Sequence, residues 1–219
     1  MSVTSEETVM ILVNAAKRIP GARFLAEKLG IVSKRRPGGR EFILDMLPTG
    51  SVGAEIGVHE GSFSTMLLER VAPKKIYLID PWQYYESDEY SAADYGGRAD
   101  GQALMDARYD KVLGIFSRQI EDGVIEVKRM TSVDALKVFP ENFLDWVYID
   151  GNHTYEFVIK DLLLCQRKVK IGGLITGDDY RIGGWWQSGV KKAVDQFKRQ
   201  KNIKLLELRN GQFVLRKLA

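Results

Sequence analysis

Short apolar runs alternate along the chain with longer segments in which apolar residues recur every three or four positions. The short runs predict strands at residues 52–57, 75–80, 124–129, 144–150 and 174–176. The longer segments predict helices at residues 63–71, 102–120, 155–169 and 189–201. Strands that alternate with helices form parallel sheets covered on both faces, so an α/β fold is expected.

Glycine-containing junctions refine this prediction. Gly172-Gly173 is expected to break the helix at 155–169 and to start the fifth strand. Near the end of the chain, Asn210-Gly211 separates two predicted strands at 203–208 and 212–215, and Asn-Gly is a strong signal for a tight hairpin. We therefore expect a Rossmann-like, seven-stranded, mostly parallel sheet with an antiparallel last strand and helices on both faces.

The first part of the chain predicts a helical extension. Residues 4–30 have helical periodicity that is interrupted at Pro20-Gly21, and a short helix is expected at 41–47. These elements form an N-terminal helical extension at 1–47, ahead of a domain at 48–219. The basic, glycine-rich loop at 34–40 is expected to be a solvated connector, and binding of phosphate or RNA is the alternative.

A polar insertion at 83–119 separates the second predicted strand from the third. Its first part, at 84–98, is too polar to be core. Loops of this length in compact domains often act as lids or binding loops. A lid and an ordered surface excursion, or an oligomer contact, are equally compatible with the sequence.

Composition excludes several classes of protein. The 219 residues are 45% hydrophobic and 28% charged, as in an ordinary globular domain, and the net charge of +3 makes no strong case for a nucleic-acid or membrane partner. The single cysteine, Cys165, lies in an apolar helical pattern and is expected to be a buried, inert thiol. No secretory signal or membrane span is visible, so a cytoplasmic location is expected.

Two segments predict a nucleotide-binding unit. Glu55-Ile-Gly-Val-His-Glu-Gly61 leaves the first strand through a loop with glycines and enters a helix at Ser62, and Asp80 closes the second strand. Gly57 and Gly61 are expected to let the backbone pass close to a ligand, and Asp80 can accept hydrogen bonds from ribose hydroxyls. The NAD fingerprint Gly-x-Gly-x-x-Gly is not met, because Glu55 stands at its first glycine.

Acidic residues follow two later strands. Asp150 ends the fourth strand, and Asp178 and Asp179 follow the fifth. If these strands are neighbours, the three carboxylates converge and repel one another, and a bound cation would remove that repulsion. Oxygen ligands suit Mg²⁺, Mn²⁺ or Ca²⁺. A solvated turn or a helix cap is the alternative explanation for the paired acids.

These segments, in this order, resemble those of a class I S-adenosylmethionine-dependent methyltransferase over residues 50–219. Ile149-Asp-Gly-Asn-His-Thr-Tyr155 and Gly173-Leu-Ile-Thr-Gly-Asp-Asp179 are similar to metal-dependent sugar O-methyltransferases of macrolide tailoring, and more distantly to catechol-type O-methyltransferases. The resemblance implies that S-adenosylmethionine is the cofactor. Mg²⁺, or another hard divalent cation, is implied as well.

The resemblance also implies roles for individual residues. Glu55 and the glycine loop would lie beside the methionine part of the cofactor, and Asp80 would hold the ribose. The implied cofactor-binding residues are Glu55, Gly57, His59, Gly61, Ser62, Phe63, Asp80, Pro81, Trp82, Met130, Ser132 and Asp150. The implied metal ligands are Asp150, Asp178 and Asp179, and His153 would be the catalytic base.

Three functions remain open at this stage. The first is metal-dependent O-methylation of a small-molecule hydroxyl on a sugar, a phenol or a polyketide. The second is metal-independent methylation of RNA or protein, although the chain lacks the Asn-Pro-Pro-Tyr and Asp-Pro-Pro-Tyr motifs of enzymes that methylate exocyclic base amines. The third is a non-catalytic cofactor-binding module, which would need neither the acids nor His153.

Aromatic residues after the paired acids, and two segments outside the cofactor site, are further candidates for contacts. Tyr180, Trp185 and Trp186 are expected either to stack on the acceptor or to anchor their loop in the core. The N-terminal helices and the insertion are candidate contact surfaces for a homo-oligomer.

Overall fold

The computed structural model describes residues 39–219. The chain divides into two compact units, Met1–Gly39 and Arg40–Ala219, and the elements below belong to the second. The helices predicted at 4–30 and most of the basic loop lie outside the described residues. Helix α3 (Glu41–Met46), which the sequence analysis grouped with the N-terminal extension, belongs to the second unit.

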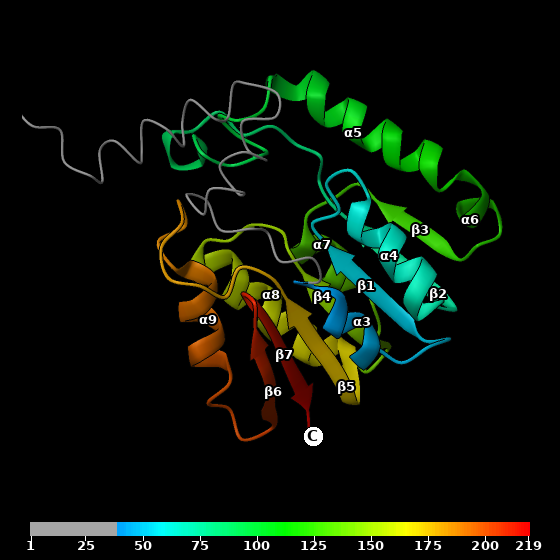
Figure 1. The fold of residues 1–219 in the computed structure, drawn as a ribbon, viewed down its shortest axis with the longest axis vertical. Coiled ribbons are helices and arrows are strands. Elements are labelled where there is room, and N and C mark those ends of the chain that lie inside the picture. The colour runs from blue at the N-terminus through cyan, green and yellow to red at the C-terminus, as the bar shows by residue number, and fades with distance from the viewer. Residues whose placement is uncertain (1–38) are drawn as a thin grey trace, which may run out of the picture. The chain divides into compact units, whose positions relative to one another are not determined.

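A seven-stranded sheet forms the centre of this unit (Figure 1). Its strands are β1 (Val52–Ile56), β2 (Lys75–Ile79), β3 (Ile125–Lys128), β4 (Leu144–Ile149), β5 (Val169–Gly177), β6 (Ile203–Arg209) and β7 (Gln212–Lys217). They lie in the order β3-β2-β1-β4-β5-β7-β6. The first five strands pair in parallel, and β7 is antiparallel to both of its neighbours. The predicted sheet, with its antiparallel last strand, is confirmed.

Helices cover both faces of the sheet. One core cluster holds residues of α3, α4 (Ser62–Val71) and α5 (Gly101–Ile115), and the other holds residues of α7 (Ser132–Val138), α8 (Tyr155–Lys168) and α9 (Gly189–Phe197). Side chains alternate between the two clusters along β4, so that Tyr148 packs on one face and Ile149 on the other. The insertion also contains a 3₁₀ turn, η1 (Asp88–Tyr90), and α6 (Ser117–Glu121).

Three local predictions need correction. Helix α7 was not predicted; it begins after Thr131, whose hydroxyl accepts a hydrogen bond from the backbone N–H of Asp134. The helix expected at 102–120 is two helices, because the chain turns at the buried Phe116. Gly172-Gly173 does not end a helix. It lies inside β5, where the register against β4 shifts and Gly172 has a φ of +83°.

The terminal hairpin turns as predicted. Asn210 and Gly211 have φ values of +53° and +80°, the left-handed backbone that a two-residue turn of this kind requires. The strands on either side pair from Arg209 opposite Gln212. This hairpin inserts β7 between β5 and β6, so Gln212 starts beside the end of β5.

Within residues 39–219, no helix has both the length and the apolar character needed to cross a membrane. Cys165 is fully buried in α8, as predicted. The cytoplasmic location stays a prediction.

Strands β2, β1, β4 and β5 are consecutive neighbours, so the loops that follow them meet at one edge of the sheet. These loops carry Gly57, Asp80, Asp150 and Asp178. The expectation that strands four and five are adjacent is therefore confirmed. This edge is where ligands bind in open parallel sheets.

Candidate functional site

The loop between β1 and α4 is shaped by contacts within the protein. Gly57 has a φ of +87°, and a Cβ atom added there would lie 2.0 Å from the carbonyl oxygen of Asp150. Gly61 has a φ of +80°, and its Cβ would lie 2.8 Å from the ring of Phe116. The sequence analysis attributed these glycines to the approach of a ligand. Protein atoms occupy the space that a Cβ atom would need, which is a separate reason for glycine at both positions, and the approach of a ligand to this backbone stays a prediction.

Asp80 organises the same loop. Its Oδ2 accepts hydrogen bonds from the backbone N–H groups of Val58 and His59, both at 3.0 Å, and its Oδ1 accepts one from Trp82 at 2.8 Å. The Trp82 indole donates to the carbonyl of His59 at 2.8 Å. A carboxylate has about four acceptor sites, so Asp80 retains capacity for a ligand hydroxyl. Its predicted role in holding ribose remains a prediction.

The other predicted cofactor residues lie in different environments. Glu55 is only 1% exposed and accepts a hydrogen bond from the Ser64 hydroxyl at 2.5 Å, and its burial raises its pKa to about 8. The Phe63 ring packs on Tyr148, with 4.2 Å between centroids. Ser62 and Met130 are exposed, and Pro81 is half-buried. Their predicted contacts with the cofactor remain predictions.

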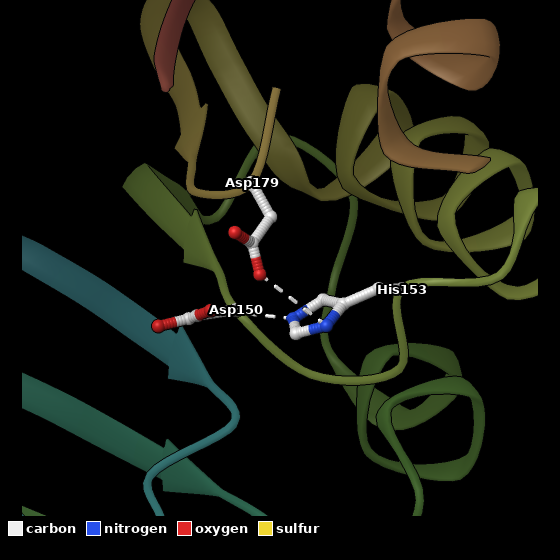
Figure 2. A group of neighbouring side chains, drawn as sticks. All are labelled: Asp150, His153 and Asp179. Atoms are coloured by element: carbon white, nitrogen blue, oxygen red, sulfur yellow. Dashed lines mark hydrogen bonds and ion pairs between the residues drawn. The ribbon is translucent and has the colours of Figure 1, made fainter. Parts of the chain in front are cut away.

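Asp150, His153 and Asp179 form a compact group (Figure 2). The imidazole lies between the two carboxylates, with Nε2 3.4 Å from Asp150 Oδ1 and Nδ1 3.4 Å from Asp179 Oδ2. One ligand atom from each residue lies within 4.8 Å of the others. Nδ1 is buried and has no hydrogen-bond partner among the described residues, because its contact with Asp179 lacks hydrogen-bond geometry.

Two arginines complete the charge pattern. Arg40 Nη1 lies 2.9 Å from Asp150 Oδ2, and its Nη2 pairs with Asp178. Arg181 Nη2 lies 2.8 Å from Asp179 Oδ1. The charges therefore alternate along a chain of six side chains: Asp178, Arg40, Asp150, His153, Asp179 and Arg181.

Asp178 differs from the other two acids. It lies outside the group that contains His153, and it accepts hydrogen bonds from the Gln212 amide and from the backbone N–H of Asp179. Gln212 in turn accepts a hydrogen bond from the Tyr148 hydroxyl at 3.0 Å. The three acids converge as expected, but Arg40 joins Asp178 to Asp150, and His153 joins Asp150 to Asp179.

Burial and mutual repulsion change the protonation of the site. Burial, followed by the charge of Asp150, raises the pKa of Asp178 to about 6. Burial also raises the pKa of Asp179, against the opposing effects of His153 and Arg181. Burial alone would lower the pKa of His153, but the neighbouring acids outweigh it and raise that pKa. The imidazole therefore keeps its proton to a higher pH than an ordinary histidine.

The sequence analysis missed both arginines as site residues. Arg40 belongs to the basic loop that was expected to be a solvated connector, and for this residue the expectation is wrong. No spacing pattern links Arg40 to the acids, which are more than a hundred positions away in the sequence. The available signal was electrostatic: three converging acids require nearby positive charge, and arginine can supply it as well as a metal.

The insertion lies against this site. Tyr90 and Tyr95 pack edge-on against Trp185, with centroid distances of 5.7 and 6.0 Å. The Asn152 amide, next to His153, donates to the Tyr90 hydroxyl at 3.2 Å. These contacts hold the insertion against the loop that carries His153 and the loop that carries Trp185. A lid and an ordered surface excursion both stay predictions.

The two tryptophans play different structural parts. Trp186 is 8% exposed and belongs to a core cluster, so it anchors its loop, and its ring centroid lies 5.0 Å from that of His153. Trp185 is only partly buried and connects the insertion to His153. Tyr180 donates a hydrogen bond to Asp195 at 2.8 Å, which also anchors the loop.

Comparison with solved structures shows the same fold in several methyltransferases. A candidate rRNA methylase from Clostridium thermocellum has a TM-score of 0.57 and 12% identity, with 82% of this chain and 93% of that chain covered. A candidate methyltransferase from Streptococcus mutans, solved with SAH, has a TM-score of 0.54 and 13% identity, with 85% and 99% covered. A candidate type 11 methyltransferase from Sulfolobus solfataricus has a TM-score of 0.52 and 15% identity, with 82% and 90% covered. At these identities the likeness shows the fold alone.

Comparison at the level of sequence gives the family. No curated protein matches the chain significantly. The profile of a methyltransferase domain family, however, matches residues 54–180, which is more than half of the chain. The matched range contains the glycine loop, Asp80, His153 and all three acids of the site. The chain therefore belongs to this methyltransferase domain family.

Proposed function

We propose that the protein transfers a methyl group from S-adenosylmethionine to a hydroxyl group of a small molecule, with the help of a divalent cation. The observation that carries this proposal is the group formed by Asp150, His153 and Asp179. It lies at the carboxyl ends of β4 and β5, beside the loop that follows β1. A methyl donor on that loop and an acceptor near His153 would be neighbours.

The proposed cofactor site rests on the loop and Asp80. The tight contact between Gly57 and Asp150 and the three backbone hydrogen bonds to Asp80 hold this loop in a defined shape before any ligand binds. Preorganisation of this kind reduces the entropy cost of binding. Family membership and the SAH found in the Streptococcus mutans structure support S-adenosylmethionine as the methyl donor.

The donor atoms of the acid site fit a divalent cation. Asp150 and Asp179 each offer a carboxylate oxygen, and the buried Nδ1 of His153 lacks a hydrogen-bond partner among the described residues. We infer that Asp150 and Asp179 would hold the ion, with Asp178 as the third predicted ligand and Mg²⁺ as the predicted metal. A cation bound there would lower the pKa of the acceptor hydroxyl.

His153 is the proposed base. Its ring lies between two carboxylates, which fix its position at the crevice edge where the acceptor is proposed to bind. Only the neutral imidazole can accept a proton. Because the acids raise the pKa of His153, they also stabilise the imidazolium that forms when it does so.

The acceptor is proposed to be a small molecule with an apolar face. Tyr90, Tyr95 and Trp185 form the aromatic side of the site, and Trp185 is only partly buried. Aromatic rings stack well on sugars and on phenols. A homo-oligomer remains a prediction.

A metal-independent methyltransferase is the second candidate. The observation that favours it is that Arg40 and Arg181 already lie beside the three acids. In such an enzyme these arginines would replace the metal charge, and His153 would act alone. The likeness to an rRNA methylase concerns the fold and leaves RNA as an alternative acceptor.

The two candidates differ in their response to chelation. Calorimetry with SAH should first show cofactor binding; its absence would contradict both candidates. Formation of SAH is then measured with a panel of glycosides, catechols and phenols, before and after treatment with EDTA. We expect activity to be lost with EDTA and restored by Mg²⁺. Activity that survives EDTA would instead support the metal-independent enzyme.

A further inference from the structure

Arg40 connects the ends of two strands through its side chain. It is the residue before helix α3, and its guanidinium reaches Asp150 after β4 and Asp178 after β5. The contact with Asp150 Oδ2 measures 2.9 Å. The guanidinium also lies 5.7 Å from the ring centroid of Phe63 and 6.0 Å from that of Tyr148, distances at which a cation is attracted to an aromatic face. Four side chains, from α4, from β4 and the loop after it, and from the loop after β5, thus surround this one positive charge.

The position of Arg40 matters because it uses oxygen atoms that a metal would need. Oδ1 of Asp150 faces His153 and Oδ2 faces Arg40, so both oxygens of this acid already lie near a basic side chain. Asp178, another predicted ligand, is bound by the other arm of the same guanidinium. A divalent cation placed between Asp150 and Asp178 would compete with Arg40 for the same lone pairs and would repel its charge.

We propose that Arg40 is an internal cation that holds the Asp150–Asp178 pair while the site is empty of metal, and that a divalent ion binds only by displacing it. This inference rests on the proposed metal-dependent function. The guanidinium stays charged at every working pH, so displacement is the way to remove its charge from the site. The side chain is 39% exposed, so it has open solvent on one side into which it can move.

This arrangement gives Arg40 two effects on the site. It reduces the repulsion between the acids in the metal-free protein. It also weakens the binding of metal ions that have a low charge or a low coordination number. Removal of its charge should therefore increase affinity for a divalent cation, whereas removal of an ordinary structural arginine should not.

The test is titration of the full chain with Mn²⁺ alone, followed by electron paramagnetic resonance of the free ion. Arg40→Gln is compared with wild type, with Arg40→Lys, and with Arg70→Gln. Arg70 pairs with Asp45 at the surface between α4 and α3, so its variant loses the same charge away from the acids. We expect Arg40→Gln to bind Mn²⁺ about tenfold more tightly or better. Arg40→Lys should stay near wild type, and Arg70→Gln should change affinity by less than about twofold.

The outcomes separate this inference from the proposed function. If wild type and Arg40→Gln bind Mn²⁺ equally well, Arg40 does not compete and the inference is wrong, while the metal-dependent function stands. If neither binds Mn²⁺ at millimolar concentration, both are wrong. Tighter binding in Arg40→Gln alone supports the inference.

A second measurement uses the wild-type protein, in case Arg40→Gln does not fold. The guanidinium Nε–Hε signal of Arg40 is assigned by its loss in Arg40→Lys and followed by NMR during titration with Mg²⁺. Displacement predicts that this signal shifts in proportion to the occupancy of the metal site. An Arg40 signal that stays in place at saturation overturns the inference.

Discussion

The hydroxyl of Ser132 donates a 2.6 Å hydrogen bond to the carboxyl group of Asp161. Ser132 is the first residue of α7, and Asp161 lies in α8, where it is only 2% exposed. This bond joins α7 to α8. The role predicted for Ser132 beside the adenine of the cofactor stays a prediction. Burial raises the pKa of Asp161 to about 7, an effect that the bond from Ser132 reduces only in part.

This buried acid predicts a pH-dependent stability. The folded pKa of Asp161 lies above its unfolded value, so its contribution to stability is fully present below about pH 4 and is lost as the pH rises to about 7. Relative to Asp161→Asn, wild type should lose up to about 4 kcal/mol of unfolding free energy over this range. Urea unfolding of both proteins at several pH values measures this difference. Parallel curves would show that Asp161 does not titrate in this way.

Gly57 and Gly211 offer a matched test of why the glycine loop needs glycine. Both have a positive φ, +87° and +80°, but a Cβ on Gly57 would lie 2.0 Å from the Asp150 carbonyl, whereas the nearest atom to a Cβ on Gly211 is 3.8 Å away. Gly211→Ala should cost about 1 kcal/mol, from backbone strain alone. Gly57→Ala should cost about 3 kcal/mol or more, because β1 and β4 must also move apart. Similar losses of unfolding free energy would contradict the steric explanation.

The sequence correctly predicted the structural features that depend on residues close together in the chain. The Asn210-Gly211 turn, the alternation of strands and helices and the burial of Cys165 each depend on residues close together in the chain, and each is confirmed. Helix α7 was missed because its seven residues offer too little periodicity to distinguish it from a loop.

The charge balance of the site could not be predicted in the same way. The strand ends and the family resemblance led to Asp150, Asp178 and Asp179. Arg40 reaches Asp150 and Asp178 from the start of helix α3, which packs next to α4, and that contact between elements has no sequence signature. Similarly, the Cβ positions of Gly57 and Gly61 are occupied by Asp150 and Phe116, which are distant in sequence. Long-range contacts of this kind decide which protein atoms surround a motif that the sequence predicts.

The two predicted metal ligands after β5 should differ in importance. Asp179 lies within the group that contains Asp150 and His153, whereas Asp178 lies outside that group and accepts a hydrogen bond from the Gln212 amide. We expect Asp179→Asn to weaken Mn²⁺ binding by about tenfold or more, and Asp178→Asn to weaken it less. Titration of both variants with Mn²⁺ gives the comparison, and SAH affinity serves as the control for folding. A larger loss in Asp178→Asn would return Asp178 to the centre of the metal site.

The two histidines should affect different kinetic steps. His153 lies between two acids, whereas His59 lies in the glycine loop, where its backbone N–H donates to Asp80. His153→Ala should lower kcat by about a hundredfold or more and leave SAH affinity nearly unchanged. His59→Ala should weaken SAH binding instead, because the imidazole is predicted to help shape the cofactor pocket, while the backbone N–H bond to Asp80 is kept in this variant. Full turnover in His153→Ala would exclude it as the base.

Trp185 and Trp186 are adjacent in sequence but should respond differently to truncation. Trp186 is 8% exposed within a core cluster, so Trp186→Ala should cost about 3 kcal/mol or more of unfolding free energy. Trp185 is only partly buried and packs against Tyr90 and Tyr95 of the insertion, so Trp185→Ala should cost less unfolding free energy.

The same variant tests the role of the insertion. If the insertion is a lid over the acceptor, Trp185→Ala should raise KM for the acceptor while SAH affinity is kept. Urea unfolding and steady-state kinetics on the two variants separate these effects. An unchanged KM in Trp185→Ala would favour an insertion that is an ordered surface excursion.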